Sequence, residues 1–222
     1  MRFIVKNTTS PGLLDLLAPH SCRGCGRTGN ILCNRCKNNI ILDHLEHPPK
    51  LKLPKSFPPT FIVSDRTGLI STLIQDFKYN STRALATSFA KILHQILPPL
   101  PPSTIIVPLP TVQQHIRARG LDHTYLIAKK LAKLCNYRVE KLLTRANSTV
   151  QVGSSRKTRL MQAKSAYTLN PKIKIDPNTT YILFDDVWTT GASMKAAVKK
   201  LRQAGAKNII VALLAFSRLE QK

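Results

Sequence analysis

Short apolar runs alternate with segments of helical periodicity along most of the chain. A compact apolar run at 61–64 predicts a short strand. Apolar residues then recur every three or four positions over 69–77 and again over 85–96, which predicts two amphipathic helices. The proline cluster at 98–102 ends the second helix, because proline cannot donate the backbone hydrogen bond that continues it.

The C-terminal half of the chain continues this rhythm. Further strands are expected at 103–110, 179–184 and 207–216, each short and rich in β-branched or large apolar residues. Asp122 can cap one intervening helix, and Gly205 ends another. Strands that alternate with helices predict an α/β fold with a mostly parallel sheet flanked by helices. In such sheets ligands bind at the carboxyl ends of the strands.

A cysteine cluster precedes this region. Cys22 and Cys25 form one Cys-x2-Cys pair, and Cys33 and Cys36 form a second after seven intervening residues. Four thiolates at this spacing complete a tetrahedral shell that suits a structural zinc ion. Two disulfides and a redox pair are the alternatives, and both are disfavoured because no export signal precedes the cluster and the pairs lie so close together. Cys135 is expected to be a packed thiol.

Proline-rich residues 43–60 divide the chain. Prolines in this segment block regular helices and remove ladder donors, so it is predicted to be a linker. The predicted organisation is a zinc-binding domain at 1–42 followed by the α/β domain at 61–222. No apolar run approaches the roughly 20 residues that span a bilayer. These features predict a cytoplasmic protein and leave a peripheral role at a membrane surface open.

The formal charge of +23 favours polyanionic partners such as nucleic acid, anionic lipid or phosphorylated small molecules. A general solubility role is the alternative, because the basic residues are spread along the chain. One window, 144–175, carries basic residues and no acid. Its basic residues are Arg145, Arg156, Lys157, Arg159, Lys164, Lys172 and Lys174.

Residues 181–193, YILFDDVWTTGAS, combine two acids with small hydroxylated residues. Asp185 and Asp186 follow a predicted buried strand, and 189–193 lead into a helix whose first N–H groups form an anion cradle. The acids suit sugar hydroxyls and the cradle suits a phosphate, so a phosphorylated sugar satisfies both. The metal-binding strand of a P-loop ATPase is disfavoured because the chain has no G-x-x-x-x-G-K-[ST]. An ordinary strand end and turn is the other alternative.

This stretch resembles the phosphoribosyl-pyrophosphate (PRPP) motif of type I phosphoribosyltransferases. The whole chain from the cysteines onward resembles the ComF family of competence proteins, which join a zinc knuckle to a phosphoribosyltransferase domain. The matching segments occur in one order: CRGCG and CNRC, then DFKYNSTRALA, VPLP, IRARGLDHTYLIA and DDVWTTG. The resemblance therefore implies a zinc-knuckle domain at 1–42 and a phosphoribosyltransferase-like domain at 61–222.

The resemblance also implies roles for particular residues. Asp185 and Asp186 would hold the ribose hydroxyls, and Thr189, Thr190, Gly191, Ala192 and Ser193 the 5′-phosphate. Leu109 and Pro110 would face pyrophosphate. Arg117 and Arg119 are candidate anion contacts, with a solvated loop or helix start as the alternative. Lys78 is either structural or phosphate-facing. Magnesium is expected to accompany PRPP.

The basic window matches the mobile loop of the family. Gln151 and Arg159 keep the family spacing, whereas Gln162 replaces the asparagine of the family pattern. Arg145, Arg156, Lys157, Arg159 and Lys164 are the candidate contacts for single-stranded DNA. Tyr167 is the only aromatic residue of this window, and one ring is a poor stacking platform.

Two functions follow as alternatives. By resemblance, the chain is a PRPP-binding competence protein that acts in DNA uptake during natural transformation. It would contact incoming single-stranded DNA at the cytoplasmic side of the inner membrane and meet uptake proteins there. The alternative is an active phosphoribosyltransferase of nucleobase salvage, although no hood that reads a base is recognisable. Whether the chain catalyses transfer, and to which acceptor, is left open.

Overall fold

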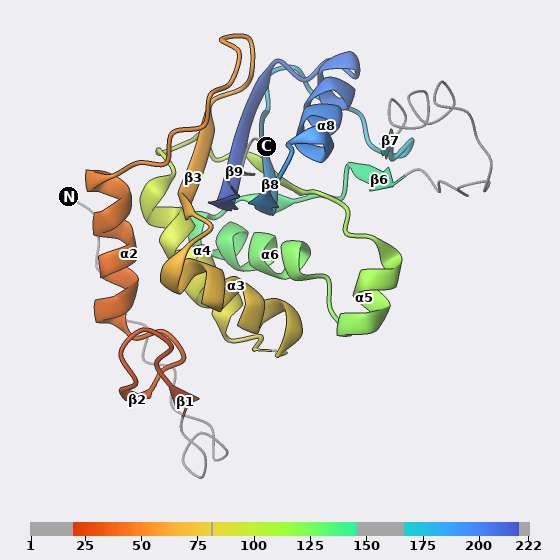
Figure 1. The fold of residues 1–222 in the computed structure, drawn as a ribbon. Coiled ribbons are helices and arrows are strands. Elements are labelled where there is room, and N and C mark those ends of the chain that lie inside the picture. The colour runs from red at the N-terminus through yellow and green to blue at the C-terminus, as the bar shows by residue number, and fades with distance from the viewer. Residues whose placement is uncertain (1–19, 81, 146–166, 218–222) are drawn as a thin grey trace.

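Five parallel strands form a central sheet in the order β3-β9-β8-β4-β5. Figure 1 labels β3, β9 and β8 of this sheet. The computed structural model describes residues 20–80, 82–145 and 167–217. The sheet strands are β3 (Thr60–Asp65), β4 (Ile105–Pro108), β5 (Arg138–Val139), β8 (Thr180–Trp188) and β9 (Asn208–Phe216). The predicted α/β class with a parallel sheet is thereby confirmed.

Helices cover both faces of this sheet. They are α3 (Gly68–Tyr79), α4 (Leu85–Ile96), α6 (His123–Cys135) and α8 (Ala192–Gln203). A further helix, α5 (Gln113–Arg119), has no buried residue. Side chains alternate across β8, so Ile182 and Phe184 join the core beneath α3, α4 and α6. Tyr181 and Leu183 point to the other face and join the core beneath α8. The result is a three-layer sandwich with one apolar core on each side of the sheet.

The connections change direction between two neighbouring central strands. The chain leaves β4 through α5 and α6 and returns to β5, packing α6 on the first face. It leaves β8 through α8 and returns to β9, packing α8 on the second face. Because the two crossovers diverge, the carboxyl ends of β4 and β8 border the crevice where open α/β sheets bind ligands. This topology defines where to look for a site.

The cysteine segment packs directly against the α/β unit. It consists of the short hairpin β1 (His20–Ser21) and β2 (Thr28–Gly29) followed by α2 (Asn34–Glu46). Its buried residues join the same core as α3 and α4; they are Cys22, Ile31, Leu32, Cys36 and Ile40. The helix α2 extends past residue 42 into the segment that was predicted to be a linker. The division into domains stays a prediction.

Most predicted elements have their expected positions. Asp122 caps α6 by accepting a hydrogen bond from the backbone N–H of Tyr125 at 3.1 Å. The strand β8 is longer than predicted, because it continues through both acids to Trp188. The helix α5 and the antiparallel ribbon of β6 (Leu143–Arg145) and β7 (Tyr167–Leu169) were not predicted. Among the helices of the described segments, none has the length and apolar character that crossing a membrane requires.

Candidate functional site

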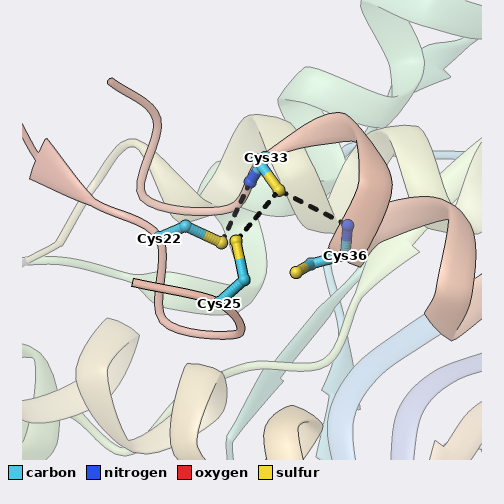
Figure 2. A group of neighbouring side chains, drawn as sticks. All are labelled: Cys22, Cys25, Cys33 and Cys36. Carbon is cyan, nitrogen blue, oxygen red and sulfur yellow. Dashed lines mark hydrogen bonds between the residues drawn. The ribbon is translucent and has the colours of Figure 1, made fainter. Parts of the chain in front are cut away.

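The four cysteines of the two Cys-x2-Cys pairs converge on one point (Figure 2). Their sulfur atoms all lie within 4.8 Å of one another, and Cys25 Sγ lies 3.7 Å from Cys33 Sγ. A tetrahedral zinc ion with Zn–S bonds of about 2.3 Å requires sulfurs about 3.8 Å apart. All four are free thiols. The predicted ligands Cys22, Cys25, Cys33 and Cys36 therefore fit a zinc ion.

Backbone groups support this cluster. Cys33 caps α2, where its sulfur accepts from the N–H of Cys36, and its own N–H donates to Cys22 Sγ at 3.4 Å. Burial opposes ionisation of Cys22, but N–H groups at Cys33, Gly24 and Cys25 outweigh it and lower the pKa of this thiol to about 6. Burial raises the pKa of Cys36 to about 12. Hydrogen bonds of this kind, from the surrounding protein to sulfur, orient the thiolates that bind a metal.

Cys135 lies apart from the cluster. It ends α6, and its sulfur is 3.3 Å from Nδ1 of His94 on α4. Burial raises the pKa of this thiol to about 11, so it stays protonated at neutral pH. The prediction of a packed thiol agrees with this environment.

A second site lies at the crevice between β4 and β8. A hollow of about 220 Å³ contains both acids of the DD pair, and we call it the acid-pair hollow. Of the predicted site residues, it brings together Leu109, Pro110, Arg119, Arg145, Asp185, Asp186 and Ser193. These residues come from five segments of the chain and meet where the topology places a ligand.

The acid pair itself is strained electrostatically. The backbone N–H of Asp186 donates to Asp185 Oδ1 at 2.9 Å, and Asp186 Oδ2 lies 2.6 Å from Nζ of Lys78. Burial and the neighbouring charge of Asp186 raise the pKa of Asp185 to about 7. A partly buried carboxyl with so high a pKa is typical of a functional position.

The turn between β8 and α8 forms a smaller hollow of about 50 Å³ lined by residues 187–194 and Asp185. Thr189 and Thr190 are exposed, and the N–H of Ala192 donates to Thr190 Oγ1 at 3.3 Å. The first turn of α8, which contains Ala192 and Ser193, points its free N–H groups toward this loop. The geometry therefore agrees with an anion cradle beside the acids.

Gly191 is the residue on which this turn depends. Its φ of +73° is left-handed, and a Cβ here would lie 2.1 Å from Cζ2 of Trp188. Gly191→Ala is expected to lower the free energy of unfolding by about 2–4 kcal/mol, since left-handed strain adds to overpacking. Urea unfolding measures this loss.

Gly120→Ala is the matched control for this change. Gly120 has a similar φ of +65°, but no atom lies within 4 Å of its added Cβ. We expect a loss of about 1 kcal/mol from backbone strain there. Equal losses in the two variants would show that the contact with Trp188 does not determine the turn.

The remaining predicted residues lie in different surroundings. Arg117 is exposed on α5 and does not line the acid-pair hollow, whereas Arg119, one half-turn later, does. Arg145 ends β6, where its Nε donates to the carbonyl of Pro110 at 3.3 Å and its guanidinium faces the buried ring of Tyr167. Arg156, Lys157, Arg159, Lys164, Gln151 and Gln162 lie outside the described residues.

Several residues that line the hollow were not assigned to it from sequence, among them Lys78, His123 and Thr111. Lys78 was left undecided, and the structure places it against Asp186. His123 is buried and lines the hollow, and its Nε2–H donates to the carbonyl of Phe77 at 2.7 Å. Burial lowers the pKa of His123. Thr111 also lines it. No local pattern marks these residues, because each reaches the site from a different helix or loop.

A larger hollow of about 570 Å³ adjoins the first. The two hollows share the loop from Leu109 to Val112 and the side chain of Arg145. The larger one continues over α5, with Gln113, Gln114 and Lys141 on its walls. A ligand in the acid-pair hollow would therefore have a second, roomier compartment beside it.

The structure thus defines an α/β protein with a parallel sheet, a crevice that holds an acid pair beside the start of α8, and a four-cysteine cluster suited to zinc. The chain is 27% identical to Competence protein F of Haemophilus influenzae over an alignment of 216 residues. The alignment covers 90% of this chain and 92% of that protein. This likeness and the cysteine cluster confirm the resemblance to the ComF family. A comparison with protein-family models gave no match.

Proposed function

We propose that this chain is a PRPP-binding competence protein that acts in DNA uptake during natural transformation. The similarity to Competence protein F supports a competence-related role. The ligand assignment rests on one observation. Asp185 and Asp186, the β8–α8 turn and the loop after β4 all lie around one crevice. Carboxylates accept from sugar hydroxyls, while N–H groups at a helix start bind phosphate.

The charges around the crevice support a ligand that carries several phosphates. Lys78, Arg119 and Arg145 line the acid-pair hollow and outnumber its two acids. Leu109 and Pro110 border the hollow from the carboxyl end of β4, where the pyrophosphate would lie. Magnesium would accompany PRPP and would offset part of the negative charge of its phosphates.

Asp186→Ala tests the site directly. We expect this variant to lose measurable PRPP binding, because it removes the carboxylate that faces the hollow and leaves Lys78 without its partner. Calorimetry with PRPP and Mg²⁺ measures the affinity, and metal analysis should show unchanged zinc content. Unaltered PRPP affinity in Asp186→Ala would refute the assignment of the acid pair.

Contact with single-stranded DNA is the second part of the proposal. The charge of +23 and the basic position of Arg145 beside the crevice support it. The proposed contacts are Arg145, Arg156, Lys157, Arg159 and Lys164. Binding through phosphates would weaken steeply as salt rises. The setting that we propose is the cytoplasmic side of the inner membrane, with peripheral contact to the membrane or to uptake proteins.

The alternative is an active phosphoribosyltransferase of nucleobase salvage. The roomy hollow beside the acid pair favours it, because a transfer reaction needs space for an acceptor next to the donor. Incubation with PRPP, Mg²⁺ and each nucleobase, followed by a pyrophosphate assay, separates the two. Turnover with a free base supports salvage. Salt-sensitive DNA binding without turnover supports the competence protein.

A further inference from the structure

The last turn of α3 contacts the cysteine segment. Asp76 is buried. Its Oδ2 lies 2.6 Å from Nε of Arg23, the residue that follows Cys22. Asp76 Oδ1 also accepts from Nδ2 of Asn80 at 2.8 Å. A carboxylate in the last turn of a helix is unfavourable beside the negative end of the helix dipole. The ion pair with Arg23 offsets that cost, so the position of this turn depends on the cysteine segment.

The same turn reaches the acid-pair hollow two residues later. Nζ of Lys78 lies 2.6 Å from Asp186 Oδ2, and their side chains are only 17% and 13% exposed. The next residue, Tyr79, lies beneath the guanidinium of Arg119 at 5.2 Å from its ring centre. A single helical turn therefore joins the cysteine segment, the acid pair and α5.

Lys78 has a specific electrostatic task in this hollow. A ligand with several phosphates must approach two adjacent carboxylates, which repel it. Because the pair with Asp186 is shielded from water, the ammonium group compensates that repulsion more strongly than an exposed lysine would. The ammonium also has three donors, so it can contact the ligand while it remains near Asp186.

We propose that Lys78 is a binding residue of the acid-pair hollow and that the Arg23–Asp76 pair is the positioning device that holds it there. Metal occupancy of the cysteine cluster and affinity for a sugar polyphosphate are then linked. The inference rests on the proposed function for its ligand, PRPP. Linkage is reciprocal, so PRPP must in turn strengthen retention of the metal by the same factor.

The rigidity of the cysteine segment supports this linkage. A Cβ on Gly24 would lie 2.7 Å from Cys36 Sγ and 3.0 Å from Leu69 Cδ2, so the loop that carries Arg23 is packed between the second cysteine pair and the start of α3. Loss of the metal would free the two cysteine pairs to separate. Arg23 would then no longer be fixed opposite Asp76.

Calorimetry with PRPP and Mg²⁺ on the full zinc-loaded chain tests the first half. Lys78→Met is expected to weaken binding about 10- to 100-fold, since a charge-assisted contact is lost. Lys78→Arg, which keeps the charge, should recover part of this loss. Asp76→Asn and Arg23→Gln each break the positioning pair and are expected to weaken binding about 5-fold or more. Asp43→Asn removes an exposed carboxylate from α2 and is the matched control.

Zinc release to a chelator tests the second half. In the wild type, saturating PRPP should raise the chelator concentration that removes half of the zinc at equilibrium by about 5-fold or more, and Asp76→Asn should abolish this protection. Wild-type affinity and protection in both Asp76→Asn and Arg23→Gln would overturn the positioning role. Wild-type affinity in Lys78→Met would overturn its binding role. If the wild-type chain fails to bind PRPP, the proposed function is refuted instead. The titration of the wild type distinguishes this outcome from a failure of the roles given to Lys78, Asp76 and Arg23.

Discussion

Replacing Asp185 with asparagine is expected to stabilise the protein at pH 8 while it abolishes PRPP binding. Burial and the charge of Asp186 raise the pKa of Asp185 to about 7, far above the 3.8 of a free aspartate. Between these two values the folded chain binds more protons than the unfolded chain. The free energy of unfolding therefore falls as pH rises from about 4 to 7, and the full cost of the charge persists above pH 7.

Asparagine removes this cost and keeps the local structure. Its side-chain oxygen can still accept from the N–H of Asp186, as Asp185 Oδ1 does at 2.9 Å. The gain in the free energy of unfolding at pH 8 should be on the order of 1–3 kcal/mol. At pH 5 the gain should fall to about a third of this value, because most of the cost accumulates between pH 5 and pH 7. Urea unfolding of both proteins at the two pH values measures the difference.

The neighbouring position supplies a control with the opposite sign. Asp186→Asn leaves the shielded ammonium of Lys78 without a carboxylate and is expected to destabilise the fold by about 1–3 kcal/mol. Both variants lose PRPP affinity, whereas their stabilities move apart. If Asp185→Asn instead destabilised the protein equally at pH 5 and pH 8, the acid pair would stabilise the fold. That result would contradict a carboxylate that lowers stability and is kept for binding.

Removal of the metal is the second change with a large expected effect. Freshly purified protein should contain about one zinc ion per chain. Chelation should lower the free energy of unfolding by on the order of 5 kcal/mol, less than the full zinc affinity of an isolated finger because this segment is also packed on the core. Cys22 and Cys36 are buried in the core shared with α3 and α4, so the loss should reach beyond the cysteine loops.

Cys36→Ser and Cys135→Ser form a matched pair for this prediction. Cys36→Ser removes one of four ligands and should lose both zinc and stability. Cys135 lies outside the cluster, beside His94, so Cys135→Ser should keep its zinc. Metal analysis and thermal unfolding report both effects. A stoichiometry well below one zinc per wild-type chain would count against the four-thiolate site.

Local patterns were sufficient to predict the main elements of the fold. Helical spacing of apolar residues located α3 and α4, and compact β-branched runs located β4, β8 and β9. The small residues before α8 and the two acids of β8 marked the crevice, because each carries its chemistry in adjacent positions. The cysteine spacing likewise indicated its own cluster.

Contacts between distant segments could not be predicted in this way. The helix α5 has no buried residue, so it left no apolar periodicity to detect. The pairs Lys78–Asp186 and Arg23–Asp76 join residues that are far apart in sequence, and each depends on how α3 packs. The charge of a side chain indicates which groups it can attract. The packing of the fold determines which of these groups it contacts.

The strand order also constrains how the chain is made on the ribosome. Among the strands of the described residues, the edge strand β3 pairs only with β9, yet β9 is synthesised after β4, β5 and β8. The ribosome adds roughly 5–20 residues per second. β3 and the helices that follow it are therefore made well before the strand that completes their sheet. Such non-local parallel pairing is slow to form and exposes unpaired edges to aggregation. A chain truncated before β9 is therefore expected to need chaperones and not to accumulate as a folded intermediate.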